Sequence, residues 1–327
     1  MTSFGYTLSS EEHGPGSLVA HARRAEELGF DFVSISDHYH PWVGEQGHSP
    51  FVWSVLGAIA ASTERIEVGV GVTCPIMRIH PAVLAQAAAT TSLLFDGRFF
   101  FGVGTGEALN EHIVGRRWPR PEIRREMLEE AVDVMRQLWT GDTVDHRGPH
   151  FEVENARLFD APEEPVMVIV SGLGPEAAQL AGRIGDGYWG NAPDRALLDA
   201  FEQAGGIGPR FAQLNLCWAE DEYTAKKTVQ RVWPNAGVSG QLSQDLPTWT
   251  HFEQATEPLT EQQVTTSVPC GPNIADDLAD SVRQYVDAGY DHLYFHQIGP
   301  DQAGFFRYWE TALQPALTSV THAASAP

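Results

Sequence analysis

Cysteine is scarce in this sequence, and its scarcity excludes a disulfide framework. The chain of 327 residues has three cysteines, Cys74, Cys217 and Cys270, which are odd in number and far apart. No pair of them has the spacing of a structural zinc site, so we expect a reducing, cytoplasmic environment. Long apolar runs are also missing, and the first residues carry no basic and apolar leader. We therefore expect neither a membrane span nor a secretory signal.

Positive charge is the second shortage. Lysine and arginine number 21 against 43 acidic residues, which gives a formal net charge of -22. A field of this sign repels nucleic acid and anionic membrane surfaces, so the sequence excludes both as main partners and leaves a small-molecule substrate. With 43% hydrophobic residues the chain can still fill a large core, and its length suits a single α/β barrel.

Short apolar stretches alternate with helical patterns along most of the chain. This alternation predicts parallel strands with right-handed crossovers, and eight such units make a TIM (β/α)8 barrel. An open doubly wound sheet would need a glycine-rich nucleotide loop after the first strand, and none is present there. An antiparallel excursion is expected at 143–158. We expect barrel strands at 4–8, 30–35, 66–72, 98–103, 166–170, 187–189, 211–219 and 290–295, and helices at 15–29, 51–61, 80–94, 120–139, 175–184, 194–204, 221–233, 274–288 and 302–317.

One segment breaks this pattern. Residues 234–272 are rich in proline, serine, threonine and glutamine and have few aliphatic residues. In a barrel enzyme an insertion of this length is typical of a lid or a binding loop, and the alternative is a flexible surface excursion. We expect one barrel domain over residues 1–320 that carries this insertion, followed by a disordered tail at 321–327.

The end of the second predicted strand carries the strongest candidate for chemistry. An apolar run ends at Ile35 and is followed by Asp37, His38, His40 and Trp42. In a TIM barrel such residues lie on the carboxyl rim of the sheet, where active sites are found. His38 is the best acid–base candidate because imidazole titrates near neutral pH, and the alternative is a histidine that caps a turn.

The spacing of His38 and His40 also occurs where metal-dependent barrel hydrolases begin their sites. Those sites need further histidines and an aspartate or lysine at later strand ends. His296 is the one late candidate in this sequence, so we expect no metal.

Glycines mark the next strand ends. Glu107 lies among the glycines of residues 102–110, where a ring can approach the backbone closely, and the alternative is an acid that stabilises a helix N-terminus. After the fifth strand, glycines precede a helix whose free N–H groups and dipole favour a phosphate, and a tight turn is the alternative. This loop consists of Ser171, Gly172, Leu173, Gly174, Pro175 and Glu176.

Taken together, these stretches resemble the luciferase-like family of flavin and deazaflavin oxidoreductases over nearly the whole chain. The similarity is greatest to the branch with the F420-dependent glucose-6-phosphate dehydrogenases and the F420-dependent alcohol dehydrogenases. It is carried by Ser36-Asp37-His38 with Pro41-Trp42, and by residues 81–87, 102–111, 181–187 and 292–296.

The resemblance implies a TIM barrel that binds coenzyme F420 at its rim and exchanges a hydride with a substrate, and we expect a homodimer. It implies a cis peptide bond between Gly71 and Val72 behind the cofactor ring. It assigns His38 the role of base, Trp42 a place beside the reacting carbon, and Glu107 a place near the ring nitrogen that gains charge. The implied cofactor contacts are Asp37, Gly71, Val72, Cys74, Asn110 and Ser171, with the phosphate on Gly172–Glu176.

The expected substrate differs from that of the sugar-phosphate dehydrogenases in this family. The resemblance implies that those enzymes hold the phosphate of their substrate with two lysines, an arginine and a threonine. Here Asn191 and Asp194 stand where the threonine and one lysine would fall, and residues 236–268 contain no lysine or arginine. A phosphate dianion would lack a cationic partner, so we expect a neutral alcohol, hemiacetal or carbonyl substrate. The alternatives are a glucose-6-phosphate dehydrogenase whose clamp is Arg78 or Arg195, an FMN-dependent monooxygenase, and a barrel without catalytic function.

Overall fold

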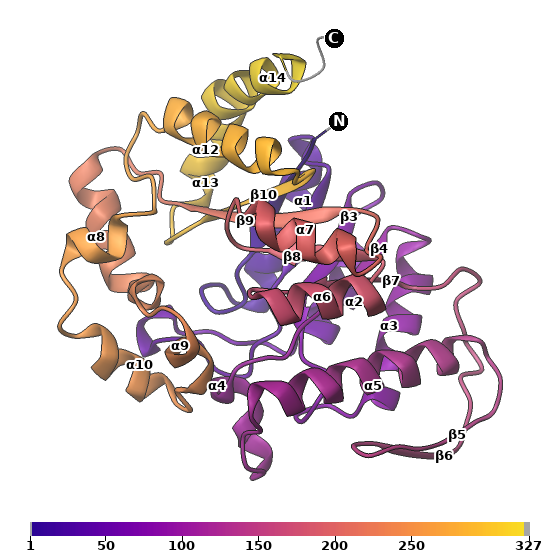
Figure 1. Ribbon diagram of the computed structural model, residues 1–327. Coiled ribbons are helices and arrows are strands. Elements are labelled where there is room, and N and C mark those ends of the chain that lie inside the picture. The colour runs from indigo at the N-terminus through magenta and orange to yellow at the C-terminus, as the bar shows by residue number, and fades with distance from the viewer. Residues whose placement is uncertain (1, 324–327) are drawn as a thin grey trace.

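Eight parallel strands close into a barrel, and helices cover its outer face (Figure 1). The computed structural model describes residues 2–323. The strand order around the barrel is β1-β10-β9-β8-β7-β4-β3-β2, so the predicted TIM barrel is confirmed. The barrel strands are β1 Ser3–Leu8, β2 Phe32–Ile35, β3 Glu67–Thr73, β4 Phe99–Val103, β7 Met167–Ser171, β8 Gly187–Gly190, β9 Arg210–Leu216 and β10 His292–Gln297.

Each predicted helix is also present, with small shifts at its ends. Helices α1, α3, α5 and α6 begin with proline, whose fixed φ suits the first turn and whose missing N–H would be unpaired there anyway. The helices that cover the barrel are α1 Pro15–Glu27, α2 Val52–Ala60, α3 Pro81–Phe95, α5 Pro121–Trp139, α6 Pro175–Ile184, α7 Arg195–Gln203, α8 Glu222–Val232, α12 Ala275–Ala288 and α13 Gln302–Tyr308.

The C-terminal helical region is longer than predicted. Helix α13 continues through a π-helical turn, Trp309–Leu313, into α14, Gln314–Ala323. The expected disordered tail at 321–327 therefore begins inside a helix, and residues 324–327 lie outside the described residues. Within residues 2–323, no helix combines the length and the apolar character that crossing a bilayer requires.

The inside of the barrel changes from aromatic to polar along the strands. Gly5 and Gly69 face inward, and a Cβ atom at either position would collide with the aromatic ring opposite. Towards the carboxyl ends the inward positions become polar, with Thr7 on β1 and the register partners His296 and Asn215 on β10 and β9. Functional groups can therefore gather only at this end of the barrel. The aromatic layer consists of Phe32, Phe100, Trp189, Phe211 and Tyr294, and Ile169 packs with them.

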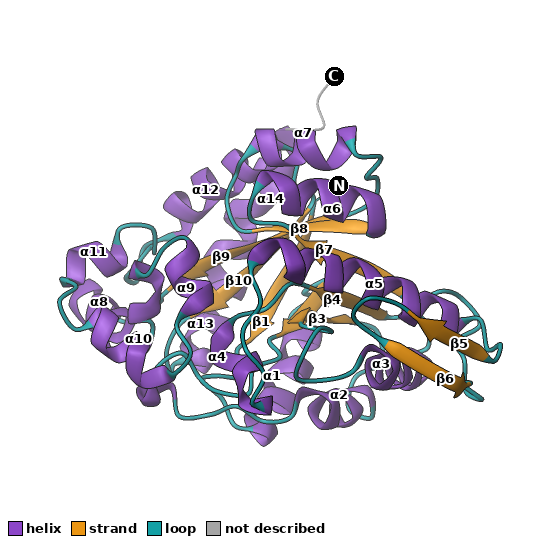
Figure 2. Cartoon of the chain, turned by 60° about the horizontal axis from the view of Figure 1, so that its bottom comes forward, coloured by secondary structure: helices purple, strands orange, loops and turns teal. Residues whose placement is uncertain are grey.

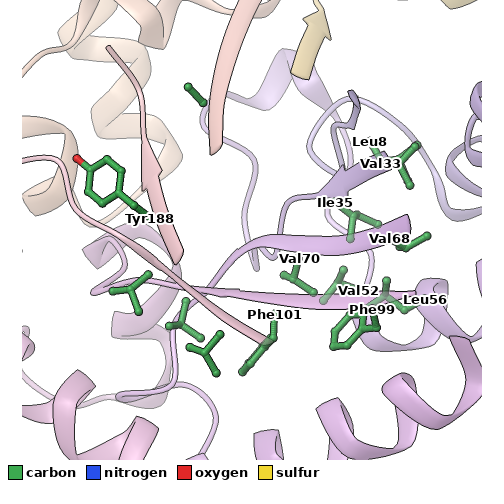
Figure 3. Packing of buried hydrophobic residues seen from close by; sticks show 14 of the residues in the cluster. Leu8, Val33, Ile35, Val52, Leu56, Val68, Val70, Phe99, Phe101 and Tyr188 are labelled. Atoms are coloured by element: carbon green, nitrogen blue, oxygen red, sulfur yellow. The ribbon is translucent and has the colours of Figure 1, made fainter. Parts of the chain in front are cut away.

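The second apolar layer lies between the strands and the surrounding helices. The alternate, outward side chains of β1 to β4 belong to the same apolar cluster as Val52 and Leu56 of α2, which are fully buried (Figure 3). Burying one such aliphatic side chain contributes about 1.5–3 kcal/mol to folding, so this layer fixes the strand ends that carry the candidate site. The residues of β1 to β4 that the figure labels are Leu8, Val33, Ile35, Val68, Val70, Phe99 and Phe101.

The insertion at 234–272 is more ordered than its sequence suggested. The hydroxyls of Thr248 and Thr260 cap two of its helices, which explains how a stretch rich in threonine and glutamine folds without an aliphatic period. It lies beside α8, on the other side of the molecule from the antiparallel hairpin that the sequence predicted at 143–158 (Figure 2). These elements are η3 Pro234–Gly237, α9 Gln241–Asp245, α10 Trp249–Thr256, α11 Glu261–Thr265, and the hairpin β5 Val144–Arg147 with β6 Glu152–Ala156.

Candidate active site

Two adjoining cavities open at the carboxyl ends of the barrel strands. The smaller has a volume of about 200 Å³ and lies over β1, β2, β3, β9 and β10. The larger has a volume of about 570 Å³ and lies between the loop after β7 and the insertion. Val72, Gly106 and Glu107 line both cavities, so the two form one continuous site at the rim.

A buried glutamate faces the predicted base in the smaller cavity. Oε1 of Glu11 lies 3.4 Å from Nε2 of His38, and Oε2 accepts a hydrogen bond from the Ser36 hydroxyl at 2.6 Å. Nδ1 of His38 lies 3.2 Å from the carbonyl oxygen of His40. A carbonyl oxygen only accepts, so Nδ1 carries the hydrogen and Nε2 is the nitrogen that gains and loses the second proton.

Glu11 is ionised at neutral pH. Its burial opposes ionisation, but the charge of His38 and the hydrogen bond from Ser36 outweigh burial and hold the pKa of Glu11 below its usual value. A carboxylate next to Nε2 stabilises the imidazolium that forms when His38 accepts a proton. The ring of His38 is therefore held between the Glu11 carboxylate at Nε2 and the His40 carbonyl oxygen at Nδ1.

Trp42 closes the outer side of the smaller cavity. Its ring lies 4.9 Å from the His38 ring and 5.1 Å from the Phe252 ring of α10, measured between centroids. Phe252 is fully buried, and the backbone N–H of Trp42 donates to Gln46 Oε1 at 2.7 Å. The insertion thus packs directly on the strand-end loop that carries His38.

Asp37 belongs to a buried ion-pair network. Its Oδ1 lies 2.9 Å from Nη2 of Arg78, and the Thr73 hydroxyl donates to Oδ2. Nε of Arg78 lies 3.3 Å from Oε1 of Glu111, whose Oε2 accepts the Arg78 backbone N–H at 2.7 Å. One guanidinium therefore joins the loops after β2, β3 and β4 beneath the site.

Two neighbouring groups stay protonated more readily than usual. Burial raises the pKa of Glu111 to about 7, against the opposing effect of Arg78, and the negative charge of Asp37 raises it further. Burial also raises the pKa of the Cys74 thiol well above its usual value, so Cys74 is a neutral thiol at neutral pH. A Cβ atom at Gly106 would lie 2.9 Å from Cβ of Cys74, which shows how closely these loops pack.

Glu107 and Asn110 line the site from the short helix α4, Ala108–Glu111. Glu107 precedes the helix, and its side chain makes no capping hydrogen bond. Oδ1 of Asn110 accepts the backbone N–H groups of Tyr39 and His40 at 2.9 and 3.1 Å. Its Nδ2 is buried and has no hydrogen-bond partner among the described residues, so a donor is left for a ligand.

The third strand supplies a bulge between the two cavities. The peptide bond between Gly71 and Val72 is cis, as the resemblance implied, and the register of β3 with β4 shifts at this point. A Cβ atom at Gly104 would lie 2.9 Å from Cγ2 of Val72. Glycine on the neighbouring strand end therefore leaves room for the Val72 side chain at the junction of the cavities.

The larger cavity has a helix N-terminus on one wall. Helix α6 begins after Gly174 without a side-chain cap, so its first N–H groups and its dipole can favour an anion. Arg124 and Arg125 lie at the edge of the same cavity, and residues 236–244 of the insertion form the facing wall. Nη2 of Arg124 donates to Gln244 Oε1 at 2.7 Å, which ties the insertion to α5.

Most of the predicted site residues line these cavities. The exceptions are Gly172 and Pro175. A Cβ atom at Gly172 would lie 2.8 Å from the Ala178 nitrogen, so this glycine permits a tight turn, and Pro175 is the first residue of α6. The smaller cavity takes Asp37, His38, Trp42, Gly71, Val72, Cys74, Glu107 and Asn110, and the larger takes Ser171, Leu173, Gly174 and Glu176.

Sequence reasoning missed Glu11 and Glu111, and it named Arg78 only as an alternative phosphate clamp and not as a partner of carboxylates. Glu11 follows β1 in the polar run of residues 9–13, and polar residues directly after a barrel strand were the available signal. Arg78 and Glu111 lie in loops of different strands, and nothing in their spacing predicts that they pair.

No cationic clamp for a phosphate faces the smaller cavity. Its lining includes no lysine or arginine among the described residues. Arg78 is engaged by two carboxylates, and the exposed Arg195 pairs with Asp199 and Glu202 at 2.7 Å. Asp194 caps α7 by accepting the Ala196 N–H.

The histidines near the site have other partners. Nδ1 of His40 lies 3.0 Å from the Leu109 carbonyl oxygen, and Nε2 of His296 lies 2.6 Å from Glu12 Oε1. Over residues 2–323, no three histidine, cysteine, aspartate or glutamate side chains are grouped so that they could hold a metal ion.

The chain is similar to enzymes of known activity. A family model described as luciferase-like monooxygenase matches residues 1–292. An F420-dependent glucose-6-phosphate dehydrogenase from Segniliparus rotundus is 36% identical over 97% of this chain and 98% of its own length. A second enzyme of that description, from Amycolatopsis mediterranei, is 35% identical over 98% of this chain and 100% of its own.

A solved structure agrees with these relatives. An F420-dependent secondary alcohol dehydrogenase in complex with an F420–acetone adduct matches with a TM-score of 0.88 and 28% identity, over 97% of this chain and 99% of its own. The barrel fold, the family model and the relatives agree, and the chain belongs to the luciferase-like family.

Proposed function

We propose that this protein is an oxidoreductase that uses coenzyme F420 and transfers a hydride between it and a neutral alcohol, hemiacetal or carbonyl compound. The observation that carries the proposal is the pairing of His38 with Glu11 beside the Gly71–Val72 bulge. An acid–base pair next to a surface for a flat ring is what reversible alcohol oxidation requires. The relatives named for F420-dependent dehydrogenases support the cofactor.

The residues present fit coenzyme F420. The buried Nδ2 of Asn110 has no partner within residues 2–323 and offers a hydrogen-bond donor to a ring or its substituents. The glycines at 104 and 106 bring the backbone close to the junction of the cavities, and the N-terminus of α6 suits the phosphate of the cofactor's side chain. When bound, the deazaflavin supplies the hydride acceptor and donor.

The protein supplies proton transfer, position and exclusion of water. In the direction of oxidation, Nε2 of His38 takes the hydroxyl proton while the carbon loses a hydride, so the alcohol becomes a carbonyl compound. Glu11 stabilises the imidazolium that results. Trp42, packed against Phe252, shields the reacting carbon from solvent. Glu107 lines both cavities, and we assign it the charge that develops at the ring nitrogen of the cofactor.

A neutral substrate is favoured over glucose 6-phosphate. The smaller cavity contains the ionised carboxylate of Glu11 and, in the described residues, no facing lysine or arginine. A phosphate dianion there would lose its hydration without a charged partner. Glucose 6-phosphate is the second candidate because the similar curated enzymes bear that name.

The test measures binding and turnover together. Titration of the purified protein with F420 and with FMN should show binding of F420 at low-micromolar concentration or better, and equal or tighter FMN binding would sink the cofactor assignment. A panel of sugar phosphates and neutral alcohols, followed by loss of the visible absorbance of oxidised F420, then separates the substrates. Efficient turnover of glucose 6-phosphate at micromolar concentration would make it the substrate.

The homodimer and the cytoplasmic location are part of this proposal. Exposed apolar side chains at Val83, Leu93 and Leu94 of α3 offer a surface for a second copy. Light scattering on the purified protein would measure the assembly, and a monomeric mass would contradict the dimer.

A further inference from the structure

A second histidine–glutamate pair lies near the first one, because the strands that lead to His38 and carry His296, β2 and β10, are the two neighbours of β1. Glu12 follows Glu11 directly, and its Oε1 lies 2.6 Å from Nε2 of His296, with both side chains almost completely buried. Its Oε2 accepts the Gly299 N–H at 2.7 Å. Nδ1 of His296 lies 3.1 Å from Oδ1 of Asn215. Both ring nitrogens therefore face oxygen acceptors, and the ring is held in one orientation.

This pair borders the smaller cavity, and nothing in the proposed proton transfer uses it. His296 lines that cavity, and its ring lies 4.4 Å from the Trp233 ring in an edge-on contact. Gln213, on the neighbouring strand β9, lines the same wall and donates from Nε2 to Asn215 Oδ1 at 2.8 Å. The wall that β9 and β10 form is thus polar, and its side chains are fixed by hydrogen bonds.

Thr7 adds an unpartnered hydroxyl to this wall. The register of β1 with β10 pairs Tyr6 with Phe295, so Thr7 and His296 occupy the next position along each strand. Thr7 is only 7% exposed and lines the cavity, yet its Oγ1 has no hydrogen-bond partner in the described part of the chain. Buried polar groups are normally paired, so an unpaired hydroxyl that faces a cavity points to a ligand.

We propose that Thr7 and Gln213, in a wall that the fixed ring of His296 completes, form a second polar subsite, which binds a second hydroxyl group of the substrate. The enzyme then selects diols and other small polyols over the matching mono-alcohols. A hydroxyl group donates and accepts at once, which suits a wall that holds a threonine hydroxyl and a side-chain amide. This inference rests on the proposed function, because it names the substrate class for the same hydride transfer.

Charge and size support a small neutral polyol. Glu11 is a buried carboxylate in the wall of the cavity, so a carboxylate or phosphate on the substrate would meet repulsion there. Trp42 and Trp233 line the same cavity with indole rings, and these apolar rings suit the C–H groups that lie between the hydroxyl groups of a polyol. A volume of about 200 Å³ holds about six or seven water molecules at roughly 30 Å³ each, and so a molecule of a few carbons.

The first test compares substrates that differ by one hydroxyl group. With F420 saturating, kcat/KM is measured for 2-propanol against 1,2-propanediol and for 2-butanol against 1,3-butanediol. We expect the diol to exceed its mono-alcohol by about tenfold or more, because an unfilled site for a hydroxyl discriminates against the analogue that lacks it. Equal values would overturn the inference and leave the proposed function standing.

The second test removes the hydroxyl of Thr7. Thr7→Val should lower the ratio of diol to mono-alcohol kcat/KM by about tenfold, the loss of one hydrogen bond, and Thr7→Ser should restore it. Thr91→Val is the matched control, since Thr91 is buried in α3 and donates within its own helix. A Thr7→Val variant that melts like the wild type and keeps the ratio would overturn the assignment.

The two proposals fail in different ways. If F420 does not bind and no alcohol of either kind is oxidised, the proposed function is wrong. If F420 binds and mono-alcohols are oxidised as well as diols, only the second subsite is wrong. A diol preference that disappears in Thr7→Val and returns in Thr7→Ser supports both.

Discussion

The Glu11 carboxylate lies 3.4 Å from Nε2 of His38, in a pocket where the side chains are 3% and 11% exposed. The two residues come from the loops after β1 and β2, which are neighbours in the barrel. The barrel's outer apolar layer fixes both strand ends, so the relationship between acid and base is a property of the whole fold.

Replacement of His38 tests its role as base. We expect His38→Ala to lower kcat by about 10²- to 10⁴-fold, the range typical for loss of a general acid or base, with a much smaller change in the dissociation constant for F420. Steady-state kinetics and a fluorescence titration measure the two quantities. His112→Ala is a suitable control, because His112 lines neither cavity in the described structure. A variant with near-normal kcat would remove His38 from the mechanism.

Replacement of Glu11 has a consequence for stability that depends on pH. The pKa of Glu11 is lowered in the folded state, so its ionisation stabilises the fold above the usual carboxyl pKa, and this stabilisation is lost as pH falls through the lowered value. We expect Glu11→Gln to lower the free energy of unfolding by about 1–3 kcal/mol at pH 7 and by less at pH 4. Thermal melts at the two pH values measure this difference. The exposed Glu45→Gln should show little effect, and an equal loss at both pH values for Glu11→Gln would contradict the prediction.

Removal of Arg78 should destabilise the protein strongly. Arg78 is the shared partner of Asp37 and Glu111, and Arg78→Met leaves two buried carboxylates without a cation. We expect Arg78→Met to lower the free energy of unfolding by about 3–5 kcal/mol at pH 8. The loss should shrink towards pH 5, because the folded variant then takes up protons that neutralise the carboxylates. Denaturant melts of Arg78→Met and of the exposed Arg195→Met give the comparison. A similar loss in both variants would argue against the network.

The glycine at position 104 should matter for cofactor binding. A Cβ atom there would lie 2.9 Å from Cγ2 of Val72, so Gly104→Ala must displace the side chain at the junction of the two cavities. We expect F420 to bind at least about tenfold more weakly, a change of about 1.4 kcal/mol. Gly57→Ala is the control: position 57 has open space in α2, and alanine there should stabilise the fold by about 0.5–1 kcal/mol. Unchanged F420 affinity in Gly104→Ala would contradict this account.

The barrel could be predicted because its signals are local. Each apolar strand and each amphipathic helix leaves its own period in the sequence, and proline marks the start of α1, α3, α5 and α6. The short helices of the insertion were missed because they lack a regular spacing of aliphatic residues. Two of them are marked instead by a threonine that caps the first turn. The end of α14 was missed because its last turn contains small residues that resemble a tail.

The site could be predicted only in part, for a related reason. His38, Trp42 and Glu107 stand out because polar residues follow apolar strands directly. Glu11 and Arg78 depend on which loops the closed barrel brings together, and that information is not local in the sequence. Thr7 is a single polar residue inside an apolar strand, and its unpaired hydroxyl becomes visible only once its neighbours are in place.

The shared wall between the two cavities fixes an order of events. Val72, Gly106 and Glu107 border both spaces, so a molecule seated in the larger cavity that extends across them becomes one side of the smaller. A small substrate that binds first enters a cavity with one open side and can dissociate again. We therefore expect ordered kinetics, in which the larger ligand binds first and dissociates last, and the smaller one binds and leaves between those two steps.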